Sequence, residues 1–67
     1  MMRVHVNGEE REFPEGSTVA DLLTAIGTEK QGVAVALEGE VVRRHDWADV
    51  VVPNGAHLEI LTAVQGG

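Results

Sequence analysis

Hydrophobic and polar residues alternate in two stretches near the ends of the sequence, MRVHV at residues 2–6 and HLEIL at residues 57–61. Alternation with a period of two is typical of a β-strand that buries one face. The dipeptide Asn7-Gly8 follows the first stretch, and both residue types tolerate the positive φ angles of a type I′ turn. We therefore expect a hairpin with EEREF at residues 9–13 as its return strand, and a separate strand near the end of the sequence.

Residues 18–27 have the pattern of an amphipathic helix. The apolar residues fall at spacings that place them on one helical face, namely Val19, Leu22, Leu23 and Ile26. Thr18 and Asp21 have the spacing of a capping box variant at the start of this helix. Gly27 stands where a helix commonly ends in the left-handed conformation.

The middle of the sequence predicts two further strands. VAVAL at residues 33–37 is a continuous apolar run, which indicates an interior strand buried on both faces. Gly39 marks a turn before a shorter strand at residues 41–42. Residues 43–55 show no clear period, so we expect an irregular stretch that Trp47 anchors to the core and that ends in a turn at Pro53-Asn54-Gly55.

The order of these elements, ββαβββ, predicts an α+β fold with a mixed five-stranded sheet and one helix packed on one face. A chain of 67 residues has room for a single domain of this kind. The alternation of the last strand indicates a place in the centre of the sheet beside the first strand. We expect the domain to span residues 1–61 and residues 62–67 to form a flexible C-terminal tail.

Charge and composition exclude several classes of function. The formal net charge of -6 opposes binding to nucleic acid, whose phosphates require a basic surface. No apolar run approaches the roughly 20 residues of a membrane span and no signal peptide is evident, so we expect a cytoplasmic protein without a membrane partner. The absence of cysteine removes thiolate metal sites and cysteine nucleophiles.

The histidines and carboxylates do not form a convincing catalytic or metal-binding pattern. His5, His45 and His57 lack the spacing of metal ligands, so we expect no metal site. His5 and His57 become neighbours on the solvent face if the first and last strands pair. We interpret Asp46, Asp49 and the acidic residues at 9–12 as solvated surface, and expect no catalytic residue in the chain.

Four stretches cover almost the whole chain in a characteristic order and spacing: VNGEERE, TVADLL, VAVALEGEVVRRHDW and EILTAVQGG. Together they resemble the bacterial sulfur carriers of the ubiquitin-like β-grasp family, and among these the ThiS-type carriers of thiamine (thiazole) biosynthesis. Such carriers often have Asn where Glu38 stands and Pro where Arg43 stands, and both differences fall in a hairpin and its exit. The resemblance implies a carrier protein that is not itself an enzyme and that binds no cofactor.

The resemblance also implies a cycle that partner enzymes carry out. A ThiF-like adenylating enzyme uses ATP to adenylate the C-terminal carboxylate of Gly67, and a cysteine-persulfide donor then supplies the sulfur of a thiocarboxylate. A ThiG-like thiazole synthase accepts that sulfur. The residues expected to enter the partner's active site are Ala63, Val64, Gln65 and Gly66. Glycine suits the last positions because a residue without Cβ passes a narrow channel and leaves the reacting carbon open to attack.

The predicted last strand also indicates a docking surface for these partners. Its alternation places His57, Glu59 and Leu61 on the side away from Leu58 and Ile60. Exposed apolar groups such as an outward Leu61 can mark a protein interface. The alternative is that Leu61 lies under a loop.

Three other functions remain open from the sequence. A molybdopterin-synthase small-subunit-type sulfur carrier would share the fold and the Gly-Gly end. A ubiquitin-like protein modifier would join Gly67 to lysine amines of target proteins. A non-covalent β-grasp binding module would use the fold alone, because fold does not by itself determine function.

Overall fold

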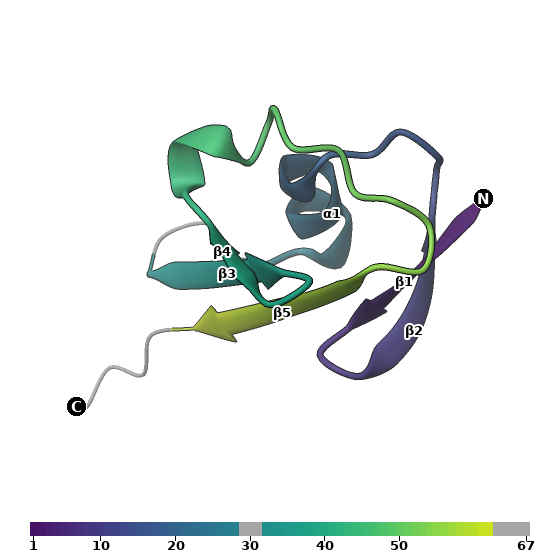
Figure 1. Cartoon of the computed structure of the whole chain (residues 1–67), viewed down its shortest axis with the longest axis horizontal. Helices are drawn as coiled ribbons and strands as arrows, with labels where there is room; N and C mark the ends of the chain where they lie inside the picture. The colour runs from purple at the N-terminus through teal and green to yellow at the C-terminus, as the bar shows by residue number, and fades with distance from the viewer. Residues whose placement is uncertain (29–31, 63–67) are drawn as a thin grey trace.

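The computed structural model describes residues 1–28 and 32–62, and the account below concerns these ranges. The elements are β1 (Met2–Val6), β2 (Glu9–Phe13), α1 (Val19–Ile26), β3 (Val33–Leu37), β4 (Glu40–Val42), the short 3₁₀ helix η1 (Arg44–Asp46) and β5 (His57–Thr62). Their order confirms the predicted ββαβββ arrangement. Figure 1 shows α1 lying across one face of the sheet, with the segment that contains η1 beside it.

The five strands form one mixed sheet in the order β2-β1-β5-β3-β4. β5 is the central strand, parallel to β1 on one side and antiparallel to β3 on the other. The two hairpins, β1–β2 and β3–β4, are antiparallel and form the two halves of the sheet. The predicted place of the last strand beside the first is therefore confirmed.

Both hairpins turn through a pair of residues with positive φ. Asn7 and Gly8 have φ angles of 51° and 86°, and Glu38 and Gly39 have φ angles of 52° and 84°. This backbone conformation is easier for Asn than for Glu, because a short polar side chain tolerates the left-handed region. Glu38 thus holds a backbone conformation that suits Asn better, which gives a physical reason for the Asn that the resemblance implies at this position.

The ends of α1 have the predicted caps. The backbone N–H of Asp21 donates to Thr18 Oγ1 at 3.2 Å, and the N–H of Thr18 donates to Asp21 Oδ2 at 3.0 Å, which completes a capping box. At the other end, Gly27 has a φ of 84°, and its N–H donates to the carbonyl oxygens of Leu23 and Thr24. These contacts satisfy backbone groups that a short helix otherwise leaves unpaired.

The core lies between α1, the inner face of the sheet and the segment that leads from η1 to β5. Its buried hydrophobic residues are Met2, Val4, Val6, Phe13, Val19, Leu22, Leu23, Val35, Trp47, Val52, Ala56, Leu58 and Ile60. Trp47 is 4% exposed, and its Nε1–H donates to the carbonyl oxygen of Val42 at 2.9 Å. The predicted anchoring role of Trp47 is confirmed.

The prediction that β3 is buried on both faces is wrong. Val35 is the one fully buried residue of β3, whereas Val33, Ala36 and Leu37 are half-buried and Ala34 is exposed. The reason is that α1 covers one face of the sheet, and the described residues supply no layer on the other. The apolar run therefore reflects an interior position in the sheet and small alanines on its uncovered face.

β5 continues through Thr62, which lies opposite Val33 of β3. Thr62 was expected to begin the tail, and the rest of that tail, residues 63–67, lies outside the described residues. The described part of the chain contains no helix that is both long and apolar enough to cross a membrane.

The capping box gives a direct test of how α1 is stabilised. Replacing Thr18 with Ala removes the acceptor of the Asp21 N–H, and we expect the free energy of unfolding to fall by about 1 kcal/mol in urea denaturation. Thr24→Ala, at an exposed position within the same helix, is the matched control and is expected to leave stability unchanged or slightly raised. Equal losses in both variants would contradict the assignment.

Candidate functional site

The face of the sheet opposite α1, called the open face below, carries the residues that the sequence indicated for docking. The strand registers place ten side chains on it: Arg3, His5, Glu10, Glu12, Ala34, Ala36, Val41, His57, Glu59 and Leu61. His57, Glu59 and Leu61 all belong to this set, as expected from the alternation of β5. Because β5 is central, these three lie in the middle of the face.

An apolar patch occupies one half of the open face, and it consists of Ala34, Ala36, Val41 and Leu61. Leu61 is opposite Ala34, and Val41 is opposite Ala36, so the side chains adjoin across neighbouring strands. Leu61 and Val41 are 67% and 77% exposed. The alternative that Leu61 lies under a loop is therefore not what the described residues show.

The other three members of the apolar patch are not predicted from the sequence. The interpretation of β3 as buried on both faces assigned Ala34 and Ala36 to the core. Val41 was assigned only to a short strand. The signal that identifies them is the register of β3 against β5 and β4, which depends on residues far apart in the sequence.

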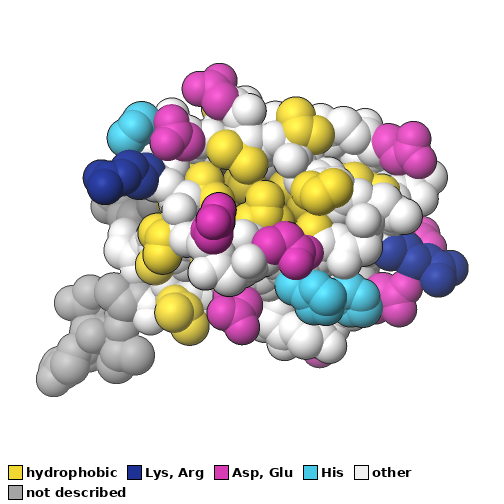
Figure 2. Space-filling model, in the orientation of Figure 1, with side chains coloured by type: hydrophobic (Ala, Val, Ile, Leu, Met, Phe, Trp, Pro, Cys, Tyr) yellow, Lys and Arg dark blue, Asp and Glu magenta, His cyan; other side chains and the backbone are white. Residues whose placement is uncertain are grey.

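Next to the apolar patch, two histidines stack on the open face. The ring centroids of His5 and His57 are 4.7 Å apart and the ring planes differ by 12°. In Figure 2, histidine side chains lie in direct contact at the lower edge of the view. Glu38 adjoins this pair, because its Oε2 accepts from the N–H of His57 at 2.7 Å and lies 3.6 Å from Nδ1 of the same residue.

The far edge of the open face is charged. Nε of Arg3 lies 3.3 Å from Oε2 of Glu10 and 3.8 Å from Oε2 of Glu12, and all three side chains are exposed. Surface pairs of this kind stabilise the fold little. The open face thus changes from apolar near the end of β5 to charged along β2.

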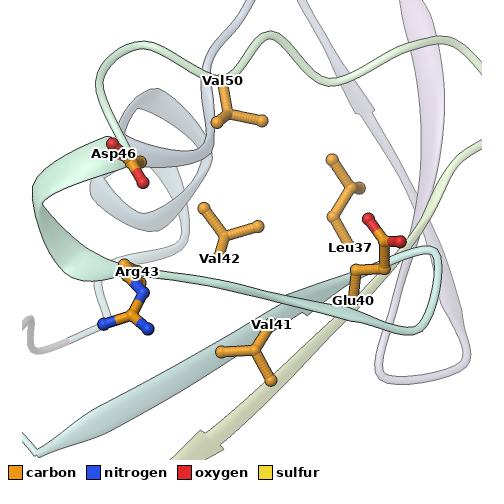
Figure 3. A pocket seen from close by; sticks show the side chains of 7 residues that line it. All are labelled: Leu37, Glu40, Val41, Val42, Arg43, Asp46 and Val50. Atoms are coloured by element: carbon orange, nitrogen blue, oxygen red, sulfur yellow. The ribbon is translucent and has the colours of Figure 1, made fainter.

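A hollow of about 310 Å³ lies between β4 and the segment formed by η1 and the residues that follow it. Figure 3 shows Leu37, Val42 and Val50 converging on its floor, with Glu40 and Asp46 at its sides. Figure 2 shows the same arrangement at the surface, with hydrophobic side chains surrounded by acidic ones.

No cluster of three or more His, Asp or Glu residues that could hold a metal ion is found within residues 1–28 and 32–62. The acidic residues at 9–12 and Asp49 lie at exposed positions, whereas Asp46 is half-buried.

Gly67, which is predicted to react, and the four residues before it, which are predicted to enter the partner's active site, lie outside the described residues. Their roles stay predictions. What the structure describes is the strand that leads to them, since β5 ends at Thr62 at one edge of the apolar patch.

Comparison with known proteins identifies the relatives of this chain. The family model of the ThiS family matches residues 4–67. The sulfur carrier protein ThiS of Thermus thermophilus is 36% identical over 64 residues, which cover 96% of this chain and 98% of that protein. A thiazole synthase of Paramagnetospirillum magneticum is 39% identical over 66 residues, which cover 98% of this chain but 20% of that protein.

The fold is also found among solved structures. The crystal structure of the thiamine biosynthesis protein ThiS from Geobacter metallireducens matches with a TM-score of 0.81 and 30% identity, over 98% of this chain and all of that one. The chain thus spans about a fifth of the thiazole synthase and nearly the full length of the carriers. On the match to the family model, the full-length relative and the shared β-grasp fold, the chain belongs to the ThiS family.

Proposed function

We propose that this chain is the sulfur carrier of thiamine thiazole biosynthesis, and that Gly67 carries the sulfur as a thiocarboxylate. The observation that carries the proposal is the match of the ThiS family model from residue 4 through Gly67, in a chain whose last described strand, β5, lies in the centre of the sheet. The proposal requires a free carboxyl group on Gly67. The proposal includes a cytoplasmic location, because ATP and cysteine-persulfide donors are available there.

The chemistry follows from the properties of a free α-carboxylate. Its reference pKa of about 3.5 keeps it ionised at neutral pH, so an oxygen of Gly67 can attack the α-phosphate of ATP and release pyrophosphate. The terminal sulfur of a cysteine persulfide then attacks the carbonyl carbon and displaces AMP. One thiol then attacks the donor's sulfur in the resulting acyl disulfide, which releases the thiocarboxylate of Gly67 and leaves a mixed disulfide on the donor. A second thiol frees the donor cysteine, and the two thiols leave as a disulfide.

The composition fits a role as carrier for partner enzymes. A chain without cysteine holds no persulfide of its own, so the sulfur must be carried on carbon. Extended at roughly 3.3 Å per residue, the stretch from Thr62 to Gly67 spans about 20 Å, enough to reach a buried site in another protein. The ThiF-like enzyme uses ATP and supplies the catalysis, and Ala63, Val64, Gln65 and Gly66 enter its active site.

The acceptor in this proposal is a thiazole synthase. A segment like this chain makes up about a fifth of the thiazole synthase of Paramagnetospirillum magneticum. Covalent linkage of two functions in one protein is expected where they act on the same reaction sequence. The relation favours a ThiG-like acceptor over a molybdopterin synthase or a lysine side chain.

The docking surface in this proposal is the apolar patch together with His57 and Glu59. An exposed Leu and Val beside two alanines form a small apolar area that a partner can cover, and the acidic groups around it favour a basic rim on that partner. The patch adjoins the end of β5, so a partner that covers it receives the following residues at its own active site.

The thiocarboxylate gives the first test of this function. When the chain is incubated with a ThiF-like enzyme, ATP and a persulfide donor, intact mass spectrometry is expected to show a single oxygen-to-sulfur exchange. Gly67→Ala is expected to slow the conversion at least about tenfold, because a Cβ crowds the reacting carbon. A residue appended after Gly67 is expected to abolish it.

Thr24→Ala, on the helix side of the fold, is the control variant and is expected to convert like the unchanged chain. A ladder of protein conjugates instead of the sulfur exchange would favour a modifier. No mass change in the unchanged chain would contradict both covalent functions and favour a binding module.

Growth of the host separates the two kinds of sulfur carrier. Deletion of the codon for Gly67 is expected to produce a requirement for thiamine that the thiazole precursor relieves, because the acceptor is a thiazole synthase. A loss of molybdoenzyme activity without that requirement would overturn the choice of pathway. The growth phenotype and molybdoenzyme activity are the measurements.

The apolar patch is tested by changing its largest strand-end residue. Leu61→Ser is expected to weaken binding to the adenylating enzyme by about tenfold in calorimetric titration, since it removes exposed apolar area from the interface. Val51→Ser is the matched control, because Val51 is 57% exposed and lies in the segment that bridges to Thr18 beside α1. Equal weakening by both variants would contradict docking through the open face.

A further inference from the structure

The pairing of β1 with β5 stops before β5 ends. The N–H of His5 donates to the carbonyl oxygen of Ala56 at 2.9 Å, and the N–H of Asn7 donates to that of Leu58, also at 2.9 Å. At Asn7 the chain turns back into β2, and the strand register ends with Val6 opposite Leu58. The next residue of β5 that faces β1, Ile60, therefore meets no backbone of a continuing strand.

The side chain of Asn7 takes the place of that missing strand. The N–H of Ile60 donates to Asn7 Oδ1 at 2.8 Å, and Asn7 Nδ2 donates to the carbonyl oxygen of Ile60 at 3.2 Å. Both bonds are partly buried and join residues 53 positions apart. Asn is suited to both tasks at this position, because it adopts the positive φ of the turn and its amide presents one donor and one acceptor.

Close packing does not replace these bonds at the end of β5. Ile60 and Thr62 border a hollow of about 250 Å³, which Val6, Arg11 and Ile26 also line. On the other side, β3 pairs with β5 through to Thr62. The two hydrogen bonds between Ile60 and Asn7 lie on the side of β5 that faces away from β3.

We infer that Asn7 is a positioning residue that fixes the end of β5 and, with it, the direction in which the chain leaves the sheet toward Gly67. The inference rests on the proposed function, since the direction of exit matters only if a partner must receive Gly67. Without the two bonds, the last residues of β5 are paired on one side, with β3. A partner docked on the apolar patch then receives the reacting carboxylate in the productive orientation less often.

The chain contains a matched control for this role at the other end of β5. Glu38 is the second non-glycine residue with a positive φ among the described residues, and it too precedes a glycine in a hairpin turn. Its Oε2 accepts from the N–H of His57 at 2.7 Å, and its own N–H donates to the carbonyl oxygen of His57 at 2.8 Å. Replacing either residue by glycine keeps the turn. The replacement removes two side-chain hydrogen bonds to β5 at Asn7 and one at Glu38.

The experiment compares Asn7→Gly, Asn7→Asp and Glu38→Gly in adenylation by a ThiF-like enzyme, measured as pyrophosphate release. For Asn7→Gly we expect kcat to fall about three- to tenfold with KM within about twofold, because docking is intact and orientation is lost. Asn7→Asp keeps the acceptor but not the donor and is expected to lie between. For Glu38→Gly we expect kcat to remain within about twofold of the unchanged chain, with any change confined to KM, because Glu38 contacts His57 of the docking surface and not the end of β5.

Two further measurements separate positioning from stability. Hydrogen exchange of the Ile60 amide is expected to accelerate in Asn7→Gly and not in Glu38→Gly, whereas a general loss of stability would accelerate both. Thermal unfolding verifies that each variant is folded at the assay temperature. If Asn7→Gly is unfolded at that temperature, Asn7→Asp is compared with Glu38→Gly in its place.

The outcomes distinguish the two proposals. Normal adenylation of the Asn7 variants, or an equal loss in Glu38→Gly, overturns the positioning role while the proposed function stands. Failure of the unchanged chain to be adenylated overturns the proposed function, and the positioning role falls with it. A rise in KM without a change in kcat also contradicts positioning, because it would assign Asn7 to docking.

Discussion

The structure depends on the insertion of β5 between β1 and β3. Each hairpin is local in sequence, but within the sheet the two are joined only through β5. Leu58, the second residue of this strand, is fully buried, and Ile60 nearly so, and both belong to the core that α1 closes. Because β5 is the last of the described strands and pairs with the first, the sheet is completed by contacts between distant residues, which slow folding.

The two faces of β5 have different roles. Its inward residues stabilise the domain, and its outward residues, His57, Glu59 and Leu61, form the middle of the open face. Successive side chains of a strand point to opposite faces, so one short segment serves the core and the open face at once. In the proposed function, the reacting group lies beyond this strand and other proteins supply the catalysis, which suits a domain of this size with little interior to spare.

Much of the fold could be predicted from local patterns. The turn at Asn7-Gly8, the capping box at Thr18 and the helix end at Gly27 are each specified by a few neighbouring residues, and all are confirmed. The burial of β3 could not be predicted in the same way. An apolar run is compatible with one or two covered faces, and only the number of layers on the sheet decides between them.

The candidate site, like the fold, could be predicted from the sequence in part. The sequence by itself determined the ββαβββ order, the outward side of the last strand and the resemblance of the Gly-Gly end, because periodicity and spacing are local properties. Only the tertiary structure joined Ala34 and Val41 to Leu61 and brought the Asn7 amide to Ile60, because strand register and sheet order depend on pairing between distant segments. Asn7 shows the difference most clearly: its neighbours explain the turn, and its contact with β5 appears only in the folded sheet.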